Sequence, residues 1–346
     1  MQELKVIGLD LAKNVFQVHG IDDRGRKLRG AKLKRGQVLP YFANLAPVLV
    51  GMEACGGAHD WARRITALGH RVKLMAPQHV KAYVQGNKTD ARDAAAIAEA
   101  AAREAVPAVA VRSVQSQQMQ ALHRTRELFL RQRIASANQI RGLLAEFGEV
   151  LPQGIKRLRE GVAQWQERVP PELAQLKELV ELLMQALRQT QERISKIEAR
   201  IQQLHREDAA CQQLESIPGV GVLTATAVVA AFGRCESFES SRKFASCLGI
   251  TPREHSSGGN QLLLGISKRG NKYVRKLLIH GARAVLKARM NKPAHAEDWE
   301  IKLAKRRGHN IAAVALAAKN ARRMWAMLRT GEVFHVDYAQ AKSACA

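Results

Sequence analysis

Cysteine is scarce in this chain, and its spacing excludes the commonest uses of cysteine. The 346 residues include five cysteines. They are Cys55, Cys211, Cys235, Cys247 and Cys345. No two of them form a CxxC pair or a Cys/His ligand spacing, which argues against a zinc site and against a disulfide framework. We therefore expect the protein to work in a reducing cytosol.

Long apolar runs are also missing, which argues against the membrane class. The longest such stretch, "GVLTATAVVAAF" at 221–232, is too short and too rich in small residues to span a bilayer. The first residues, "MQELKVIGLD", lack the apolar core of a signal peptide. A surface-bound protein would need a basic amphipathic anchor or a lipidation signal, and the sequence shows neither.

Acidic residues are few compared with basic ones. The chain has 55 Lys and Arg but 31 Asp and Glu, a net charge of +24. Most of this excess is C-terminal, because Arg242 to Arg329 holds 20 basic and 4 acidic residues, a net charge of +16. A field this positive favours polyanionic partners, of which nucleic acid is the commonest.

The first hundred residues predict a mixed α/β domain. Two β-branched runs lie within 4–21, with a turn around Lys13–Asn14. Further strands are predicted at 27–34, 47–57 and 70–77, and helices at 36–45, 58–69 and 90–104. Three strands followed by a βαβ run and closing helices are typical of a single α/β domain. At 346 residues, the whole chain is long enough for two or three domains.

The middle of the chain predicts two long helices, at 113–149 and 172–208. In the second helix, nine residues are spaced alternately four and three apart, as in a coiled-coil seam. They are Leu176, Val180, Leu183, Leu187, Thr190, Ile194, Ile197, Ile201 and Leu204. In the first helix, Arg126 and Arg133 interrupt any comparable register. An antiparallel hairpin within one chain and a coiled coil that joins protomers both fit this pattern.

The remaining, most basic part of the chain opens on the turn "IPGVG" at 217–221. It resembles a helix-hairpin-helix turn, in which Gly219 and Gly221 would free backbone amides to hold a phosphate at a helix N-terminus. Such turns also serve as plain helix connectors. Further helices are predicted at 239–247, 270–290 and 309–329.

Four carboxylates in the N-terminal domain are candidates for a metal site. Asp10 and Glu53 each end a predicted strand, and Asp90 and Asp93 share one face at the start of a predicted helix. Strand ends and helix starts are where an α/β domain places its site. Hard oxygen ligands select Mg²⁺ or Mn²⁺ over zinc, and two such ions can clamp the attacking and leaving oxygens of a phosphodiester.

The order Asp10, Glu53 and "KTDARDA" at 88–94 resembles the RuvC-like domain of a group of bacterial insertion-sequence transposases. These are the DEDD transposases, also called bridge-RNA-guided recombinases. The resemblance continues through the helical middle and "IPGVG" to "FASCLGITPREHSSGG" and "ISKRGN". It implies an α/β domain of the ribonuclease-H type, a long helical coiled-coil middle and a mostly helical, basic C-terminal domain. The corresponding predicted boundaries are 1–111, 112–210 and 211–346.

The resemblance also implies a serine nucleophile. The family presents a serine before a glycine, which Ser257 matches directly before Gly258, while the neighbouring Ser256 is the alternative. Metal held by Asp10, Glu53, Asp90 and Asp93 is implied to act with this serine in a composite site between protomers. A serine hydroxyl is a poor nucleophile at pH 7, so metals and basic residues must activate the phosphate.

Nucleic acid is the expected partner throughout. Donors to phosphate are predicted at Gly219, Gly221, Lys268, Arg269, Lys272, Arg275 and Lys276. The resemblance implies a folded guide RNA that pairs with DNA, a homo-oligomer, and a bacterial cytoplasmic protein associated with the nucleoid. The low aromatic content, 5%, is more consistent with contacts to nucleic-acid backbones than with stacking on bases.

The sequence thus predicts a DNA transposase or recombinase that works through a covalent serine–DNA intermediate with Mg²⁺ or Mn²⁺. Two alternatives stay open at this point. One is a metal-dependent junction nuclease with water as nucleophile. The other is a non-catalytic nucleic-acid-binding scaffold whose carboxylates are surface caps.

Overall fold

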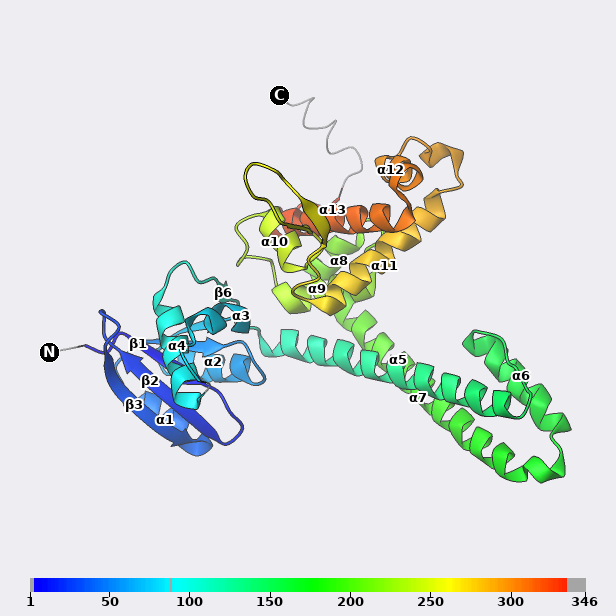
Figure 1. The fold of residues 1–346 in the computed structure, drawn as a ribbon, viewed down its shortest axis with the longest axis horizontal. Helices are drawn as coiled ribbons and strands as arrows, with labels where there is room; N and C mark the ends of the chain where they lie inside the picture. Colours follow the sequence, from blue (N-terminus) through cyan, green and yellow to red (C-terminus); the bar gives the residue numbers. More distant parts are fainter. Residues whose placement is uncertain (1–2, 88, 335–346) are drawn as a thin grey trace. The chain divides into compact units, whose positions relative to one another are not determined.

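The chain divides into two compact units, Met1–Ser113 and Val114–Ala346. The computed structural model describes residues 3–87 and 89–334, so Cys345 lies outside the described residues. The boundary falls close to the end predicted for the N-terminal domain. The further division of the second unit at residue 210 stays a prediction. Each unit is described by itself below (Figure 1).

Unit 1, Met1–Ser113, is built on one six-stranded sheet of order β3-β2-β1-β4-β5-β6. The strands are β1 (Val6–Asp10), β2 (Val15–Ile21), β3 (Lys27–Lys34), β4 (Leu49–Glu53), β5 (Arg71–Met75) and β6 (Ala108–Val109). Strands β1, β4 and β5 run parallel to one another, whereas β2, β3 and β6 pair antiparallel with their neighbours. The five predicted strands are confirmed, and the short β6 had no sequence signal.

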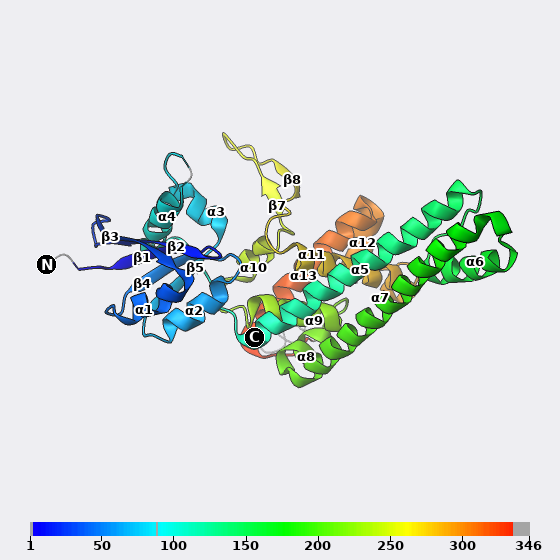
Figure 2. The same cartoon turned by 90° about the horizontal axis from the view of Figure 1, so that it is seen from below.

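Helices cover both faces of this sheet. Figure 2 shows α1 (Val38–Ala43) and α2 (Ala58–Thr66) on one face and α4 (Asp90–Ala102) on the other. Phe16, Phe42 and Trp61 lie in the core on the α1 and α2 face. The short helix α3 (Pro77–Val80) and the 3₁₀ turns Arg35–Gln37 and Lys81–Tyr83 complete the unit. The predicted mixed α/β architecture is thereby confirmed.

Helix α4 packs unusually close to the sheet, because glycine and alanine face each other there. A Cβ atom added to Gly8 of β1 would lie 2.5 Å from the backbone nitrogen of Ala98. A Cβ atom added to Gly51 of β4 would lie 2.5 Å from the Cβ atom of Ala101. The alanine-rich sequence of α4 therefore provides a flat helix face as well as high helix propensity. This close approach brings the first turn of α4 beside the ends of β1 and β4.

Unit 2 begins with a long helical hairpin. Helices α5 (Val114–Glu146) and α7 (Ala174–Glu207) pack against each other along the hairpin, and α6 (Ile155–Arg168) covers its distal end. The 3₁₀ turn Pro171–Leu173 connects α6 to α7. The two long helices match the prediction, but α6 was not predicted.

The predicted seam of α7 faces α5. Six of its nine members are buried, namely Leu176, Val180, Leu187, Thr190, Ile194 and Ile201. The two arginines that interrupt the register of α5 have partners on α7, since Arg126 pairs with Glu198 and Arg133 donates to Gln191. The seam is therefore used within the chain, and joining of protomers through the hairpin stays a prediction.

The rest of unit 2 is a helical bundle with one projecting hairpin (Figure 1). Its helices are α8 (Ala209–Glu215), α9 (Val222–Phe232), α10 (Ser241–Cys247), α11 (Lys272–Arg289), α12 (Trp299–Arg307) and α13 (His309–Thr330), with a 3₁₀ turn at Pro293–His295. Helices α10, α11 and α13 confirm their predictions, whereas α8 and α12 were not predicted. The two short strands β7 (Pro252–Glu254) and β8 (Leu263–Ile266) form the hairpin. None of the helices within residues 3–87 and 89–334 is long and apolar enough to cross a membrane.

The packing of α4 gives a first testable prediction. Gly8→Ala forces a methyl group into the backbone of α4 and should lower the free energy of unfolding by about 1–3 kcal/mol, the range for overpacking a tight core. Gly36→Ala is the matched control, because no atom lies within 4 Å of an added Cβ there. Chemical denaturation of the full-length variants measures both effects. Equal stability of the two variants would contradict the close packing.

Candidate active site

The four predicted carboxylates come from three elements that meet at one edge of the sheet in unit 1. Asp10 is the last residue of β1 and Glu53 the last residue of β4. Asp90 and Asp93 lie in the first turn of α4, where Thr89 caps the helix by accepting a hydrogen bond from the Arg92 amide. The positive end of the helix dipole stabilises carboxylates at this position. The fold therefore brings all four predicted residues to the same region.

The electrostatics of Asp10 show that these four charges interact. Burial is the largest cause that raises the pKa of Asp10, followed by repulsion from Asp93, Asp90 and Glu53, and the resulting pKa is about 6. A neighbouring like charge raises the pKa of a carboxyl because it disfavours the ionised form. A bound cation would offset the negative charges of the neighbouring carboxylates. It would therefore favour the ionised form of Asp10 near neutral pH.

The donor set fits a hard divalent cation in its chemistry. It offers carboxylate oxygens, which are the ligands that Mg²⁺ and Mn²⁺ prefer. Within the described part of the chain, however, no three Asp, Glu, His or Cys side chains are drawn together tightly enough to ligate one ion. Binding of a metal therefore requires the side chains of Asp10, Glu53, Asp90 and Asp93 to move toward one another.

The predicted nucleophile lies at the tip of the β7–β8 hairpin in unit 2. Ser257 and Asn260 form an isolated bridge, and the Asn260 amide donates to the Ser257 carbonyl at 3.0 Å. Gly258 and Gly259 between them have φ values of 57° and 80°. Two successive positive φ angles are typical of the tight type I′ hairpin turn, which glycine adopts without strain.

The two adjacent serines differ in their contacts. The Ser256 hydroxyl donates to the Glu254 carboxylate at 2.7 Å. The Ser257 side chain is exposed, and its hydroxyl makes no hydrogen bond with any residue that the structure describes. Of the two hydroxyls, that of Ser257 is the one available to an external group.

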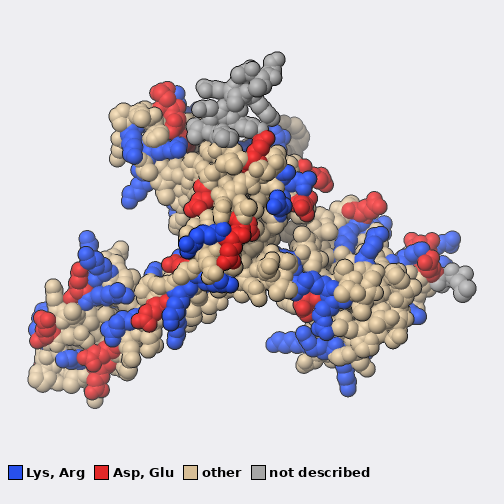
Figure 3. All heavy atoms as spheres, turned by 180° about the vertical axis from the view of Figure 1, so that it is seen from behind, with Lys and Arg blue, Asp and Glu red and all other residues tan. Residues whose placement is uncertain are grey.

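The predicted basic donors fall into two groups. Lys268, Arg269 and Lys272 are exposed. Arg275, by contrast, is buried, and its guanidinium donates to the Leu248 and Arg269 carbonyls, each at 2.9 Å. Its charge is used to join two loops of unit 2, which is a structural role that the sequence did not indicate. In Figure 3, Lys and Arg side chains are spread over the visible surface of both units.

The remaining residues predicted to bind phosphate also make contacts within the folded chain. Lys276 forms an ion pair with Glu127 of α5. Gly219, with a φ of +87°, packs against the backbone of Gly281 in α11, whose carbonyl oxygen would lie 2.9 Å from an added Cβ. Gly221 caps α9 and has open space around it. Packing alone thus explains Gly219, while Gly221 keeps the predicted place at a helix N-terminus.

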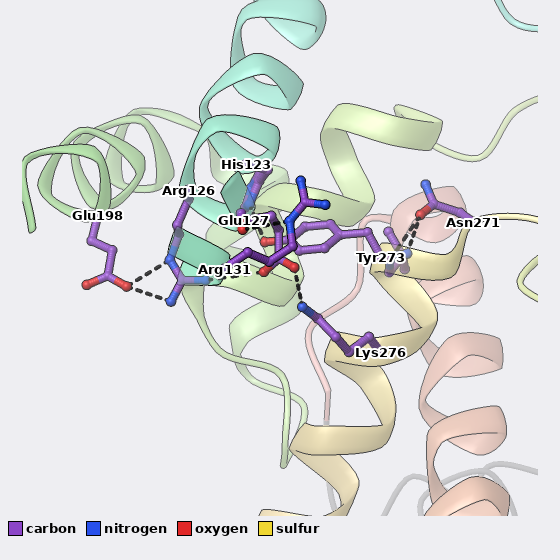
Figure 4. A network of polar contacts seen from close by, with 9 residues as sticks. His123, Arg126, Glu127, Arg131, Glu198, Asn271, Tyr273 and Lys276 are labelled. Carbon is purple, nitrogen blue, oxygen red and sulfur yellow. Dashed lines mark hydrogen bonds and ion pairs between the residues drawn. The ribbon is translucent and has the colours of Figure 1, made fainter. Parts of the chain in front are cut away.

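Sequence reasoning missed a partly buried polar network that joins α5, α7, α9 and α11 (Figure 4). His123 Nδ1 lies 2.9 Å from the Tyr273 hydroxyl, and His123 Nε2 lies 3.0 Å from the Thr226 hydroxyl. Because Thr226 donates to the Val222 carbonyl, it accepts from Nε2–H, and Nδ1 then accepts from Tyr273. Beside this pair, Arg126 binds Glu198. No local pattern links His123 with a tyrosine 150 residues away.

This network supports the start of α11. Asn271 accepts hydrogen bonds from the Tyr273 and Val274 amides and thereby caps the helix. Tyr273 and Lys276, on the first turns of α11, are both held by α5. The exposed basic residues Lys268, Arg269 and Lys272 lie directly before or at this helix start, so the network fixes the base of the loop that displays them.

Two family models match the chain. The first, described as a transposase model of the DEDD type, matches residues 7–148. The second, described as the transposase IS116/IS110/IS902 family, matches residues 211–300. The first match includes all four carboxylates, and the second includes "IPGVG", the serine hairpin and the start of α11.

Curated relatives match over nearly the whole chain. A probable family 20 transposase of Pseudomonas aeruginosa is 47% identical over 330 residues, which cover 94% of this chain and 97% of the relative. The transposase for insertion sequence element IS1111A of Coxiella burnetii is 42% identical, with 96% and 92% covered. The transposase for IS1328 of Yersinia enterocolitica is 36% identical, with 96% and 99% covered.

The buried histidine gives a second testable prediction. Burial, with a smaller contribution from Arg126, lowers the pKa of His123 to about 4. An unfolded histidine takes up its proton near pH 6.5, so stability due to the neutral folded His123 is lost as the pH falls from about 6.5 toward 4. The loss between pH 7 and pH 5 should be about 2 kcal/mol.

His123→Gln keeps hydrogen-bonding groups at this position but does not titrate, so the pH dependence of its unfolding free energy should be smaller by that amount. Urea unfolding of the full-length protein at both pH values measures the difference. His280→Gln, at an exposed position of α11, controls for the loss of a histidine as such. An unchanged pH dependence in His123→Gln would show that the imidazole is not held neutral.

Proposed function

This chain belongs to the IS116/IS110/IS902 family of insertion-sequence transposases, and on that premise we propose that it cuts and rejoins DNA through a covalent serine–DNA intermediate. The observation that carries this proposal is the gathering of Asp10, Glu53, Asp90 and Asp93 at one edge of the sheet. Four mutually repelling carboxylates in a chain of net charge +24 have a physical use where cations bridge them to phosphate. This supports the RuvC-like assignment of unit 1.

Asp10, Glu53, Asp90 and Asp93 would hold Mg²⁺ or Mn²⁺. When bound, such ions polarise the phosphodiester and neutralise charge that develops on its oxygens. The raised pKa of Asp10 fits this assignment, because cation binding favours the ionised carboxylates. In this proposal the carboxylates would position the scissile phosphate through the bound cations and do not react covalently.

Ser257 would be the attacking group. Its oxygen gives up its proton and forms a new bond to phosphorus while one phosphorus–oxygen bond of the DNA backbone breaks, and the departing deoxyribose oxygen takes up a proton, so that protons balance. Attack of a deoxyribose hydroxyl on the serine phosphodiester then reverses these steps with a new strand. The number of phosphodiester bonds is conserved, so no net hydrolysis occurs. The free Ser257 hydroxyl at the tip of a tight turn supports this role over Ser256, which is bound to Glu254.

The finer points of the family resemblance belong to the same proposal. DNA ends and target DNA are the substrates, an element-encoded guide RNA reads sequence by base pairing, and a homo-oligomer carries out the exchange. The exposed Lys268, Arg269 and Lys272 are suited to binding the nucleic-acid backbone, since their positive charges attract phosphate. Base reading by the protein itself would call for more aromatic and bidentate contacts.

The carboxylates are tested by isosteric substitution. Asp10→Asn, Glu53→Gln, Asp90→Asn and Asp93→Asn should each lower Mg²⁺-dependent strand cleavage by on the order of 10²-fold or more, because metal assistance contributes several kcal/mol. DNA binding should persist. Asp60→Asn, on the exposed part of α2 in the same unit, should cleave normally. Full activity in any two of the four variants would remove the metal-site assignment.

The nucleophile is tested with labelled DNA that carries an element end. After denaturation, wild-type protein and Ser256→Ala should carry the label covalently, whereas Ser257→Ala should bind the DNA but form no adduct, because alanine offers no oxygen to phosphorus. An adduct that survives in Ser257→Ala and is lost in Ser256→Ala moves the nucleophile by one residue. Metal-dependent nicks without any adduct in wild type would instead indicate water as nucleophile.

A further inference from the structure

The edge strand of the sheet in unit 1 carries a dense basic cluster that no step above uses. Residues 24–35 include seven Lys and Arg and no Asp or Glu. Most of this segment is β3, which is the outer strand of the six-stranded sheet (Figure 1). The cluster lies in unit 1, outside the basic C-terminal region that the sequence highlights.

The strand register places two of these lysines beside the carboxylates. Asp10 of β1 is paired with Gln17 of β2, and Gln17 is paired with Lys32 of β3. Lys34 follows two residues later, opposite Val15. With about 4.8 Å between neighbouring strands, the Lys32 Cα atom lies about 10 Å from that of Asp10.

Lys32 and Lys34 also point to the same face of the sheet as the carboxylates. Directly paired residues share a face, so Asp10, Gln17 and Lys32 lie on one side. This is the α4 side, because Gly8, two residues before Asp10, packs against α4. On β3, the intervening Leu33 faces the other side and is buried in the core with Phe42 and Trp61.

Both lysines are free to bind an anion. Their side chains are exposed, and neither forms an ion pair within residues 3–87 and 89–334. Other members of the cluster are engaged, since Arg26 pairs with Asp22, and Arg35 donates to the Lys13 carbonyl and lies over the Trp61 ring. The unpaired ammonium groups of Lys32 and Lys34 thus lie beside the four carboxylates, on the same face of the sheet.

From this placement we infer that Lys32 and Lys34 bind the backbone of the DNA strand whose scissile phosphate lies at the carboxylates. The inference rests on the proposed function. A distance of about 10 Å corresponds to about three nucleotide steps of 3.4 Å, so the phosphate contacted by Lys32 lies within about three nucleotides of the cleaved one. Lysine binds phosphate as a point charge, so the contact is independent of base sequence.

Lysines on an edge strand also hinder pairing with other strands. Hindrance of strand pairing requires only that a lysine lie on the edge strand β3. It does not require that the lysine lie near the carboxylates or on the α4 face of the sheet. Arg29 separates the two explanations. It is exposed on β3, but the register pairs it with Gly20 and hence with Ile7. It therefore lies three rows from Asp10, on the opposite face of the sheet.

The first experiment measures DNA binding without cleavage. Full-length Asp10→Asn protein, with or without Lys32→Gln and Lys34→Gln together, is titrated with element-end DNA at a series of KCl concentrations. Loss of two phosphate contacts should reduce the slope of log K against log salt by about 1.8 for duplex or 1.4 for single-stranded DNA. Lys32→Arg with Lys34→Arg should restore the slope. Arg29→Gln should leave it unchanged, and an equal effect of Arg29→Gln would overturn the inference.

The second experiment maps the contact. A photo-crosslinking residue, Lys32→benzoylphenylalanine, should crosslink to DNA within about three nucleotides of the cleaved phosphate, the interval set by the strand spacing. The same residue at position 29 should not. Crosslinks that fall only on guide RNA, or on DNA far from the cleavage position, would overturn the inference. Neither readout needs the serine adduct, so failure of the proposed chemistry and failure of this contact are distinguishable.

Discussion

The arrangement of unit 1 depends on one steric constraint, the close approach of α4 to Gly8 and Gly51. Side chains larger than hydrogen at these positions would meet the backbone of Ala98 and the side chain of Ala101. The same approach brings the first turn of α4 beside the ends of β1 and β4, where four carboxylates repel one another. Packing in the interior thus holds four negative charges close together at the ends of β1 and β4, although they repel one another. Such an arrangement is expected of a functional site and not of a structural one.

Much of this arrangement could be predicted because its signals are local. Alternating β-branched residues marked β1 and β2, and the alanines marked α4. Strand ends and helix starts then identified Asp10, Glu53, Asp90 and Asp93 as one group. The seam of α7 was equally clear, although the sequence could not say what covers it. Arg126 and Arg133 interrupt a comparable register in α5, and Glu198 and Gln191 of α7 bind them.

The missed features depend on contacts between distant parts of the chain. Arg275 has the same sequence signature as its neighbour Lys272, yet it is buried and binds two carbonyls. His123 meets Tyr273 only because α5 and α11 both pack against α9. The β7–β8 hairpin has few β-branched residues, and its leucines Leu262, Leu263 and Leu264 stay exposed, so neither periodicity nor burial marked it. Position and not residue type decided each of these roles.

The carboxylates of unit 1 and the serine of unit 2 each lack a group that the proposed reaction needs. In unit 1, carboxylates and nearby lysines can hold a phosphate and its counter-ions, but they include no hydroxyl poised for attack. In unit 2, Ser257 offers a free hydroxyl, but the carboxylate of its hairpin, Glu254, binds Ser256 and Gln261. A neutral hydroxyl at pH 7 attacks phosphorus only when the phosphate is strongly polarised. An isolated hairpin would therefore be inert toward DNA, and cleavage would occur only where groups outside the hairpin activate the phosphate. Such dependence would protect DNA from a chain whose positive charge binds it readily.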